Sequence, residues 1–207
     1  FDGPPHDKRY FALHMTALES YFESGSYGKL DIEWNVAPAD SRSAYVLPEE
    51  MGYYHDYSSE QVWYVDQVER FTRDAFAAAD TTDTLDFSLY DGFVLFHAGS
   101  DWQTDINLDS PYDLPSAHIA LGEPILVNDG TVEVWDAALM PETSNQDGIV
   151  VVLNGTLAHE VGHILGLPDL YNIWNFYPAI GYWGIMDSGG RIGMSTPWGY
   201  AYGLIPS

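Results

Sequence analysis

Residues 154–171 read NGTLAHEVGHILGLPDLY, and this stretch decides most of what the sequence indicates. Asn154 or Thr156 is suited to cap the start of a helix, because short polar side chains accept hydrogen bonds from its first free N–H groups. Gly166 is suited to end it, because glycine readily takes the left-handed conformation found just past a helix. The stretch therefore predicts a short helix that stops before Gly166.

Two histidines lie away from the apolar side of this predicted helix, and a glutamate lies beside them. At about 100° per residue, one side gathers four apolar residues: Leu157, Val161, Ile164 and Leu165. His159 and His163 fall near the opposite side, one turn apart, so that both imidazoles can reach one metal ion from a cleft or from solvent. Glu160 lies beside them. This is the H-E-x-x-H pattern, in which zinc lowers the pKa of bound water to about 7 and the glutamate is the general base.

Gly166 and Asp169 extend the pattern to H-E-x-x-H-x-x-G-x-x-D. The glycine lets the chain turn sharply, so that Asp169 can supply a third ligand, an oxygen at about 2.0–2.2 Å from the metal. Three protein ligands leave a fourth position open for water, as in catalytic zinc sites. Asp187 is the alternative third ligand. Taken alone, H-E-x-x-H would equally fit a chance pair of histidines on a helix.

A second motif lies downstream, where residues 182–190 read YWGIMDSGG. A lone methionine near a tryptophan is usually core filler, but Met186 falls where a metzincin places the Met-turn under its metal. HEVGHILGLPDLY followed by YWGIMDSGG resembles the immune inhibitor A family of secreted bacterial metallopeptidases, a metzincin-related group of zincins. Two earlier segments resemble the family more loosely, YFESGSYGKLDIEWNV and FVLFHAG.

The resemblance implies an α+β zincin-type catalytic domain, with a mixed sheet, backing helices and an active-site helix. It implies one domain over residues 1–207, in which an upper subdomain to about residue 166 and a lower one from residue 167 flank a substrate cleft. Such domains usually continue with a helix beyond the Met-turn, so we expect the sequence to be part of a longer protein.

The resemblance also implies the roles of individual residues. His159 and His163 are zinc ligands, Glu160 is the general base and Met186 is the turn methionine. Asp169 stands where many metzincins have a histidine. Ser188 stands where some metzincins have a tyrosine that steadies the transition state, which leaves the oxyanion-stabilising group open. The candidates for that group are Tyr182, His97 and His118.

The composition excludes several classes of protein. Of 207 residues, 46% are hydrophobic and 18% charged, which excludes a disordered chain or a coiled coil. The net charge of −24 makes nucleic acid a poor partner. No apolar run reaches the roughly 18–20 residues of a membrane span, and the absence of cysteine excludes disulfides and thiolate zinc sites.

A loop rich in aspartate offers a candidate calcium site. Its carboxylates recur every four residues: Asp101, Asp105, Asp109 and Asp113. Oxygen-rich loops can wrap calcium, which takes about 6–8 oxygen ligands. The loop lacks EF-hand spacing, and a solvated acidic loop is the simpler interpretation. The resemblance also implies stabilisation by calcium.

Periodicity predicts the remaining elements. We expect helices over residues 7–23 and 58–79, the second with a capping box of Ser58 and Gln61. We expect strands at residues 30–36, 91–99, 131–138 and 148–153, with that at 91–99 buried on both faces and a loop over 100–116. This mixture predicts an α+β domain.

These observations together predict a secreted zinc metalloendopeptidase acting on protein or peptide substrates. Further domains or a propeptide outside the sequence are expected partners. One alternative is a non-catalytic extracellular module that keeps the zincin fold as a scaffold or adhesin, although a scaffold has no need of Glu160. Another is zinc hydrolysis of a non-peptide bond, which the Gly166 turn and Met186 disfavour.

Overall fold

The computed structural model describes residues 6–38, 44–55, 64–148, 153–175 and 177–191. They form two compact units, and the chain passes from the second unit into the first and then back into the second. Ala37–Asp147 supply the first unit, and His6–Val36 with the described part of Gly148–Ser207 supply the second. The second unit is therefore built from two segments far apart in the sequence.

The first unit is built on a mixed sheet of three strands. These are β1 (Val94–His97), β2 (Ala117–Val127) and β3 (Val132–Pro141), in the order β1-β3-β2. β1 runs parallel to β3, whereas β2 is antiparallel to it. Helices together with a small mixed sheet confirm the expected α+β class.

The strand β2 was not expected from the sequence. It pairs with β3 in two registers, with a break between Ala120 and Ile125 where Gly122 and Pro124 interrupt the apolar alternation. Proline lacks the N–H group that a ladder requires, which explains the break. The β2–β3 turn is made by three successive residues with positive φ: Asn128, Asp129 and Gly130.

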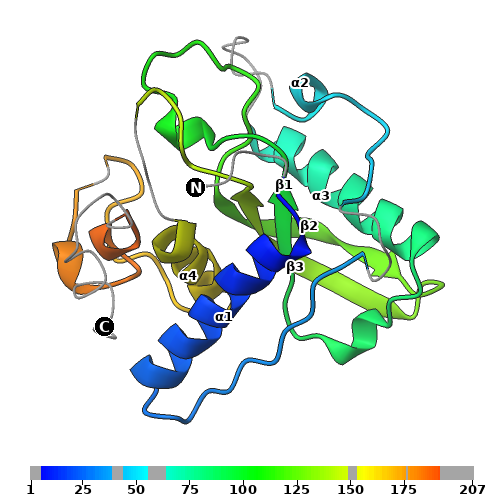
Figure 1. Ribbon diagram of the computed structural model, residues 1–207, viewed down its shortest axis with the longest axis horizontal. Coiled ribbons are helices and arrows are strands. Elements are labelled where there is room, and N and C mark those ends of the chain that lie inside the picture. The colour runs from blue at the N-terminus through cyan, green and yellow to red at the C-terminus, as the bar shows by residue number, and fades with distance from the viewer. Residues whose placement is uncertain (1–5, 39–43, 56–63, 149–152, 176, 192–207) are drawn as a thin grey trace. The chain divides into compact units, whose positions relative to one another are not determined.

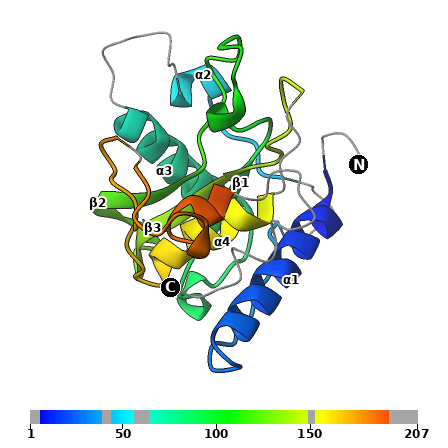
Figure 2. The ribbon, with the colours of Figure 1, turned by 90° about the vertical axis from the view of Figure 1, so that its left-hand side faces the viewer.

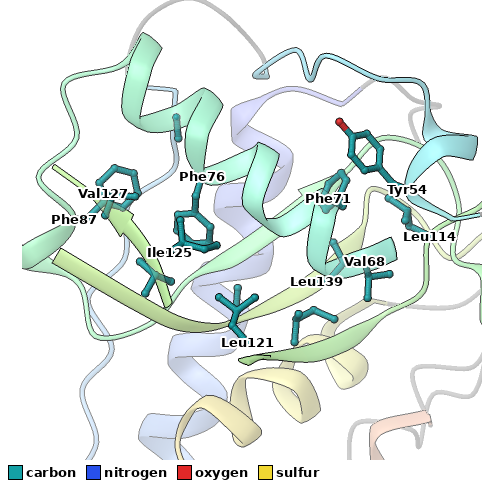
Figure 3. Close-up of a cluster of buried hydrophobic side chains, with 14 residues drawn as sticks. Tyr54, Val68, Phe71, Phe76, Phe87, Leu114, Leu121, Ile125, Val127 and Leu139 are labelled. Atoms are coloured by element: carbon teal, nitrogen blue, oxygen red, sulfur yellow. The ribbon is translucent and has the colours of Figure 1, made fainter. Parts of the chain in front are cut away.

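The helix α3 (Tyr64–Thr82) packs on this sheet and buries its apolar side chains against it (Figure 3). Val68, Phe71 and Phe76 are buried there together with side chains of β2 and β3. A short helix, α2 (Met51–Tyr54), also contacts α3. The expected helix is thus confirmed from residue 64 onward, while Ser58 and Gln61 lie outside the described residues.

The remaining predictions for the first unit are confirmed in part. β1 covers the centre of the segment expected at 91–99, and Val94, Leu95 and Phe96 are half-buried rather than fully buried. β3 confirms the strand expected at 131–138. Two 3₁₀ helices lie nearby, η1 (Phe87–Leu89) and η2 (Trp102–Thr104), the second within the expected loop.

The second unit contains α1 (Lys8–Gly25), which confirms the helix expected at 7–23. Asp7 caps it by accepting hydrogen bonds from two backbone N–H groups, and Leu18 and Phe22 are buried. α1 contacts the helix α4 (Leu153–Ile164), as Figure 1 shows. A hydrogen bond joins His14 of α1 to Asn154 of α4.

The strand expected at 30–36 is wrong, because residues 30–36 adopt no regular structure. Their side chains do alternate between half-buried and exposed, as the pattern predicted. The hydrogen bonds of a strand also require a neighbouring strand, which a local sequence pattern does not reveal. Trp34 is instead tied to α1, since its indole N–H donates to Glu19.

The start of α4 also differs from expectation. α4 begins at Leu153, so Asn154 and Thr156 lie inside the helix and do not cap it. The strand expected at 148–153 falls mostly outside the described residues. Leu165 lies past the end of the helix and is 43% exposed, so it does not join the buried face. None of the described helices is both long and apolar enough to cross a bilayer.

The buried His97 at the end of β1 predicts that acid destabilises the protein. Burial lowers the pKa of this imidazole to about 4, although its hydrogen bond to the Ala98 carbonyl acts to raise it. Between about pH 6.5 and pH 4 the unfolded state therefore binds the extra proton, and the free energy of unfolding falls as the pH falls, by up to about 3 kcal/mol. Urea unfolding of wild type and of His97→Asn at pH 7, 6 and 5 measures this.

Asp113 has the opposite effect on the pH dependence of stability. Its pKa is raised to about 6, mainly by burial and to a lesser extent by neighbouring carboxylates. Its contribution to stability therefore grows as the pH falls, and it is common to both proteins. The difference in the free energy of unfolding between wild type and His97→Asn therefore reports the contribution of the histidine alone. Parallel stability curves for the two proteins would contradict the prediction.

Candidate metal centre

The side chains of His159, Glu160 and His163 lie close together on the helix α4. One ligand atom of each of these side chains lies within 4.8 Å of the others. His159 and Glu160 are 8% and 7% exposed. His159 is thus less open than expected, because the 3₁₀ helix η4 (Ser188–Arg191) packs against α4, as Figure 2 shows.

Backbone carbonyl groups orient both imidazoles. The Nδ1 atom of His159 lies 2.8 Å from the carbonyl oxygen of Ile185, and Nδ1 of His163 lies 2.9 Å from that of Leu167. A carbonyl oxygen accepts but cannot donate, so each Nδ1 carries the proton. In the neutral imidazole, each Nε2 then presents a lone pair, as a metal ligand requires. Neither carbonyl group could be identified from the motif, because a motif records side chains and not backbone contacts.

Asp169 completes a three-ligand arrangement. Its Oδ1 atom lies 3.2 Å from Nε2 of His159 and 3.4 Å from Nε2 of His163. This oxygen is buried and accepts no hydrogen bond within the described residues. Ligands in a tetrahedral zinc site with bonds of about 2.0–2.2 Å are separated by about 3.4 Å. The two distances from Asp169 are therefore compatible with a zinc ion whose donors would be two imidazole nitrogens and one carboxylate oxygen.

The turn after α4 brings Asp169 to this position. Gly166 has a φ of +85°, and the N–H groups of Gly166 and Leu167 donate to the carbonyls of His163 and Gly162. This is the helix end for which Gly166 was identified. The chain then reverses, and the Leu170 N–H donates to the carbonyl of Met186 at 2.7 Å.

The alternative ligand, Asp187, has both carboxylate oxygens engaged elsewhere. Oδ2 accepts hydrogen bonds from three successive backbone N–H groups, those of Ala179, Ile180 and Gly181. Oδ1 accepts from the N–H and the hydroxyl of Ser188. The hydrogen bonding thus favours Asp169 over Asp187 as a ligand.

Met186 lies directly under α4. It is 1% exposed, and a Cβ atom built on Gly162 would lie 2.6 Å from its sulfur. Gly162 stands between the two histidines of the motif, so the absence of a side chain there allows the turn to approach. Gly190 plays a comparable part, since a Cβ atom there would lie 3.0 Å from Cβ of His159. Neither glycine stands out in the sequence, because the contact that requires it is with a residue distant in the chain.

The three oxyanion candidates are found in different surroundings. Tyr182, in η3 (Gly181–Trp183), is 60% exposed and belongs to the same unit as α4. His97 is buried in the first unit, and His118 there has its Nε2 atom 3.0 Å from Asp136. A further aromatic residue, Tyr171, stacks near His159 with ring centroids 6.2 Å apart.

The aspartate-rich loop of the first unit is held partly by its own backbone. Asp105 accepts hydrogen bonds from the N–H groups of Asp109 and Ser110, and Asp101 accepts from those of Gln103 and Ser116. A carboxylate oxygen of Asp147, which the sequence analysis did not include, lies within 4.8 Å of those of Asp105 and Asp109. Calcium binding by this loop stays a prediction.

Comparison with known proteins yields one family match. Residues 116–198 match the family described as immune inhibitor A peptidase M6, catalytic domain. The matched residues cover less than half of the chain, but they include β2, β3, α4 and the turn at Met186. No curated protein matches the chain.

Replacing Gly162 by alanine should disturb the centre through Met186. Glycine to alanine within a helix ordinarily stabilises by about 1 kcal/mol. Here the new methyl group meets the Met186 sulfur, and such overpacking costs about 1–3 kcal/mol. We expect a lower free energy of unfolding, measured by urea denaturation.

The double variant Gly162→Ala/Met186→Ala tests the cause. With the sulfur removed, the added methyl group should cost less than it does in the presence of Met186, which gives a favourable coupling energy. Gly122→Ala is the matched control, because a Cβ atom there meets nothing within 4 Å. Strictly additive effects of the two substitutions would contradict the prediction.

Proposed function

We propose that the chain is a secreted zinc endopeptidase with Glu160 as its general base, because residues 116–198 match the catalytic domain of the immune inhibitor A peptidases, a family of metallopeptidases. In this proposal His159, His163 and Asp169 hold the zinc ion. The family implies a metal, typically zinc, and protein substrates.

The observation that carries the proposal is the position of Asp169 Oδ1. This buried oxygen faces two imidazole nitrogens at 3.2 and 3.4 Å and accepts no hydrogen bond within the described residues. A buried, unpaired carboxylate oxygen is costly unless a cation compensates it. Its two neighbours present lone pairs, so a metal ion would satisfy all three atoms at once. The donor set of two histidines and one carboxylate is typical of catalytic zinc.

The chemistry follows from the residues around the metal. When bound, zinc would supply Lewis-acid polarisation of the scissile carbonyl and acidify a water molecule. Glu160 follows the ligand His159 directly on the same helix and is itself buried, so its carboxylate is suited to take a proton from the attacking water. It then passes this proton to the leaving amine, and the peptide bond breaks.

Action outside the cell is part of the proposal and is supported by the resemblance and by composition. The chain has no cysteine and carries 31 acidic against 7 basic residues. The alternative of a non-catalytic scaffold would leave Glu160 without a role. Its position beside two histidines supports the catalytic proposal, because a general base must lie next to the residues that would hold the metal.

Glu160→Gln should abolish hydrolysis while leaving the metal bound. The amide is nearly isosteric with the carboxylate but cannot accept the proton, and loss of a general base costs about 10²–10⁴-fold in rate. Casein zymography and turnover of a mixed peptide library measure activity. Zinc content after dialysis measures the metal.

The control is Glu123→Gln, which changes an exposed glutamate of β2. It should cleave at the wild-type rate. Undiminished cleavage by Glu160→Gln would exclude this mechanism, and absence of any cleavage by wild type would favour the scaffold alternative. The peptide products also define the specificity, which the structure does not provide.

Asp169→Asn should weaken zinc binding sharply. The substitution keeps the size of the side chain but removes its charge. Loss of a residue that hydrogen-bonds to a metal ligand typically lowers metal affinity about 10–100-fold. Loss of a ligand itself should lower zinc affinity by at least as much. Zinc retention against a graded chelator series measures the effect.

Asp129→Asn provides the control, because it makes the same change at an exposed turn residue with positive φ, where asparagine is well tolerated. It should retain zinc as wild type does. Retention of zinc by Asp169→Asn at wild-type chelator concentrations would exclude Asp169 as a ligand.

A further inference from the structure

We propose that Asp187 is a positioning residue of the metal centre, whose carboxylate holds both the loop that follows Asp169 and the turn whose carbonyl orients His159. The inference rests on the proposed function, because it takes Asp169 and His159 as zinc ligands. It gives Asp187 a role other than that of the alternative ligand.

The carboxylate of Asp187 gathers five hydrogen-bond donors. Oδ2 accepts from the N–H groups of Ala179, Ile180 and Gly181 at 2.8, 2.7 and 2.9 Å. Oδ1 accepts from the N–H and the hydroxyl of Ser188 at 2.6 and 3.1 Å. Asp187 is 3% exposed, so water does not compete for these donors.

The carboxylate is held in its charged form. Burial is the largest influence and acts to raise its pKa, but the backbone N–H groups of Ile180, Ser188 and Gly181 outweigh it, and the pKa of Asp187 is lowered. Hydrogen bonds to a charged acceptor are about twice as strong as those between neutral groups. One anion therefore fixes two separate backbone segments.

The first segment leads to Asp169. The Ala179 N–H that donates to Asp187 also lies 3.2 Å from the carbonyl oxygen of Leu170, the residue after Asp169. The N–H of Leu170 donates to the carbonyl of Met186 at 2.7 Å. Both polar groups of the Leu170 backbone are thus held, one by the Met186 turn and one by the segment at Ala179 that Asp187 anchors. Asp169 has little freedom to leave the centre.

The second segment leads to His159. The N–H groups of Asp187 and Gly189 both donate to the carbonyl of Gly184, which closes a tight turn around Ile185 and Met186. Asp187 braces this turn further by binding the Ser188 N–H. The Ile185 carbonyl inside the turn accepts the hydrogen bond from Nδ1 of His159. A turn that opened would release this carbonyl and the orientation of the imidazole.

An asparagine cannot replace Asp187 in this role. Its amide presents one oxygen and one NH₂ group, and the NH₂ group would face either three N–H groups or the Ser188 donors. One set of buried donors would be left unsatisfied, and both segments would lose their common anchor. The isosteric Asp187→Asn therefore isolates the proposed function of the carboxylate.

The test uses the full chain and zinc itself. Asp187→Asn is compared with Asp86→Asn, whose carboxylate in the first unit likewise accepts from the N–H and hydroxyl of a nearby serine, Ser88. Partners of metal ligands typically contribute 10–100-fold to metal affinity. We expect the zinc dissociation constant, from chelator competition, to rise about 10–100-fold for Asp187→Asn and to stay within about twofold for Asp86→Asn.

The visible spectrum of the cobalt(II)-substituted proteins separates positioning from general stability. At saturating cobalt the ligand-field bands report the geometry of the ligands, which a merely structural residue would leave unchanged. We expect shifted bands for Asp187→Asn and wild-type bands for Asp86→Asn. Wild-type zinc affinity and wild-type bands in a folded Asp187→Asn would overturn the proposal.

If Asp187→Asn does not fold, hydrogen exchange in wild type tests whether the Asp187 carboxylate holds the backbone N–H groups. The amides of Ala179, Ile180 and Gly181 should exchange slowly in the metal-free protein, because the carboxylate holds all three. Exchange at the rate of unprotected amides would overturn the proposal. His163→Ala serves as the check on the premise: if it binds zinc as wild type does, the proposed zinc site fails, whereas its loss of zinc leaves Asp187 alone under test.

Discussion

Two hydrogen bonds from imidazole Nδ1 atoms to backbone carbonyls are the constraint on which the second unit depends. A histidine on a helix can rotate about two bonds, and in either tautomer one of its nitrogens is a donor. The carbonyls of Ile185 and Leu167 fix both the rotation and the tautomer of the two imidazoles, so that both Nε2 atoms face Asp169. The carbonyls must then lie close beneath α4, and the rest of the unit is arranged to bring them there.

Two glycines of this unit are explained by that requirement. At Gly162 a Cβ atom would lie 2.6 Å from the Met186 sulfur, and at Gly190 it would lie 3.0 Å from Cβ of His159. The turn can approach this closely because neither residue has a side chain. Gly166 has a different task, because its positive φ reverses the chain after α4. The H-E-x-x-H motif therefore depends on residues that take no part in the chemistry.

The sequence predicted the helix α4, its end at Gly166 and the grouping of two histidines, a glutamate and Asp169, because these depend on local geometry. It did not predict β2, whose apolar alternation is broken by Gly122 and Pro124. It predicted a strand at 30–36, where the side chains alternate but do not belong to a strand that pairs with any other described segment. The roles of the Ile185 carbonyl and of Asp187 could not be predicted, because both depend on contacts with residues distant in the chain.

The discontinuous second unit has a consequence for the order of assembly. Its first segment, His6–Val36, leaves the ribosome well before its second, which begins at Gly148, and the whole first unit lies between them. Contacts such as that of α1 with α4 must close a long loop, which is slow and entropically costly while the intervening chain is unfolded. The residues that would bind the metal all lie in the second segment, so a nascent chain that has released only the first segment and Ala37–Asp147 contains none of them.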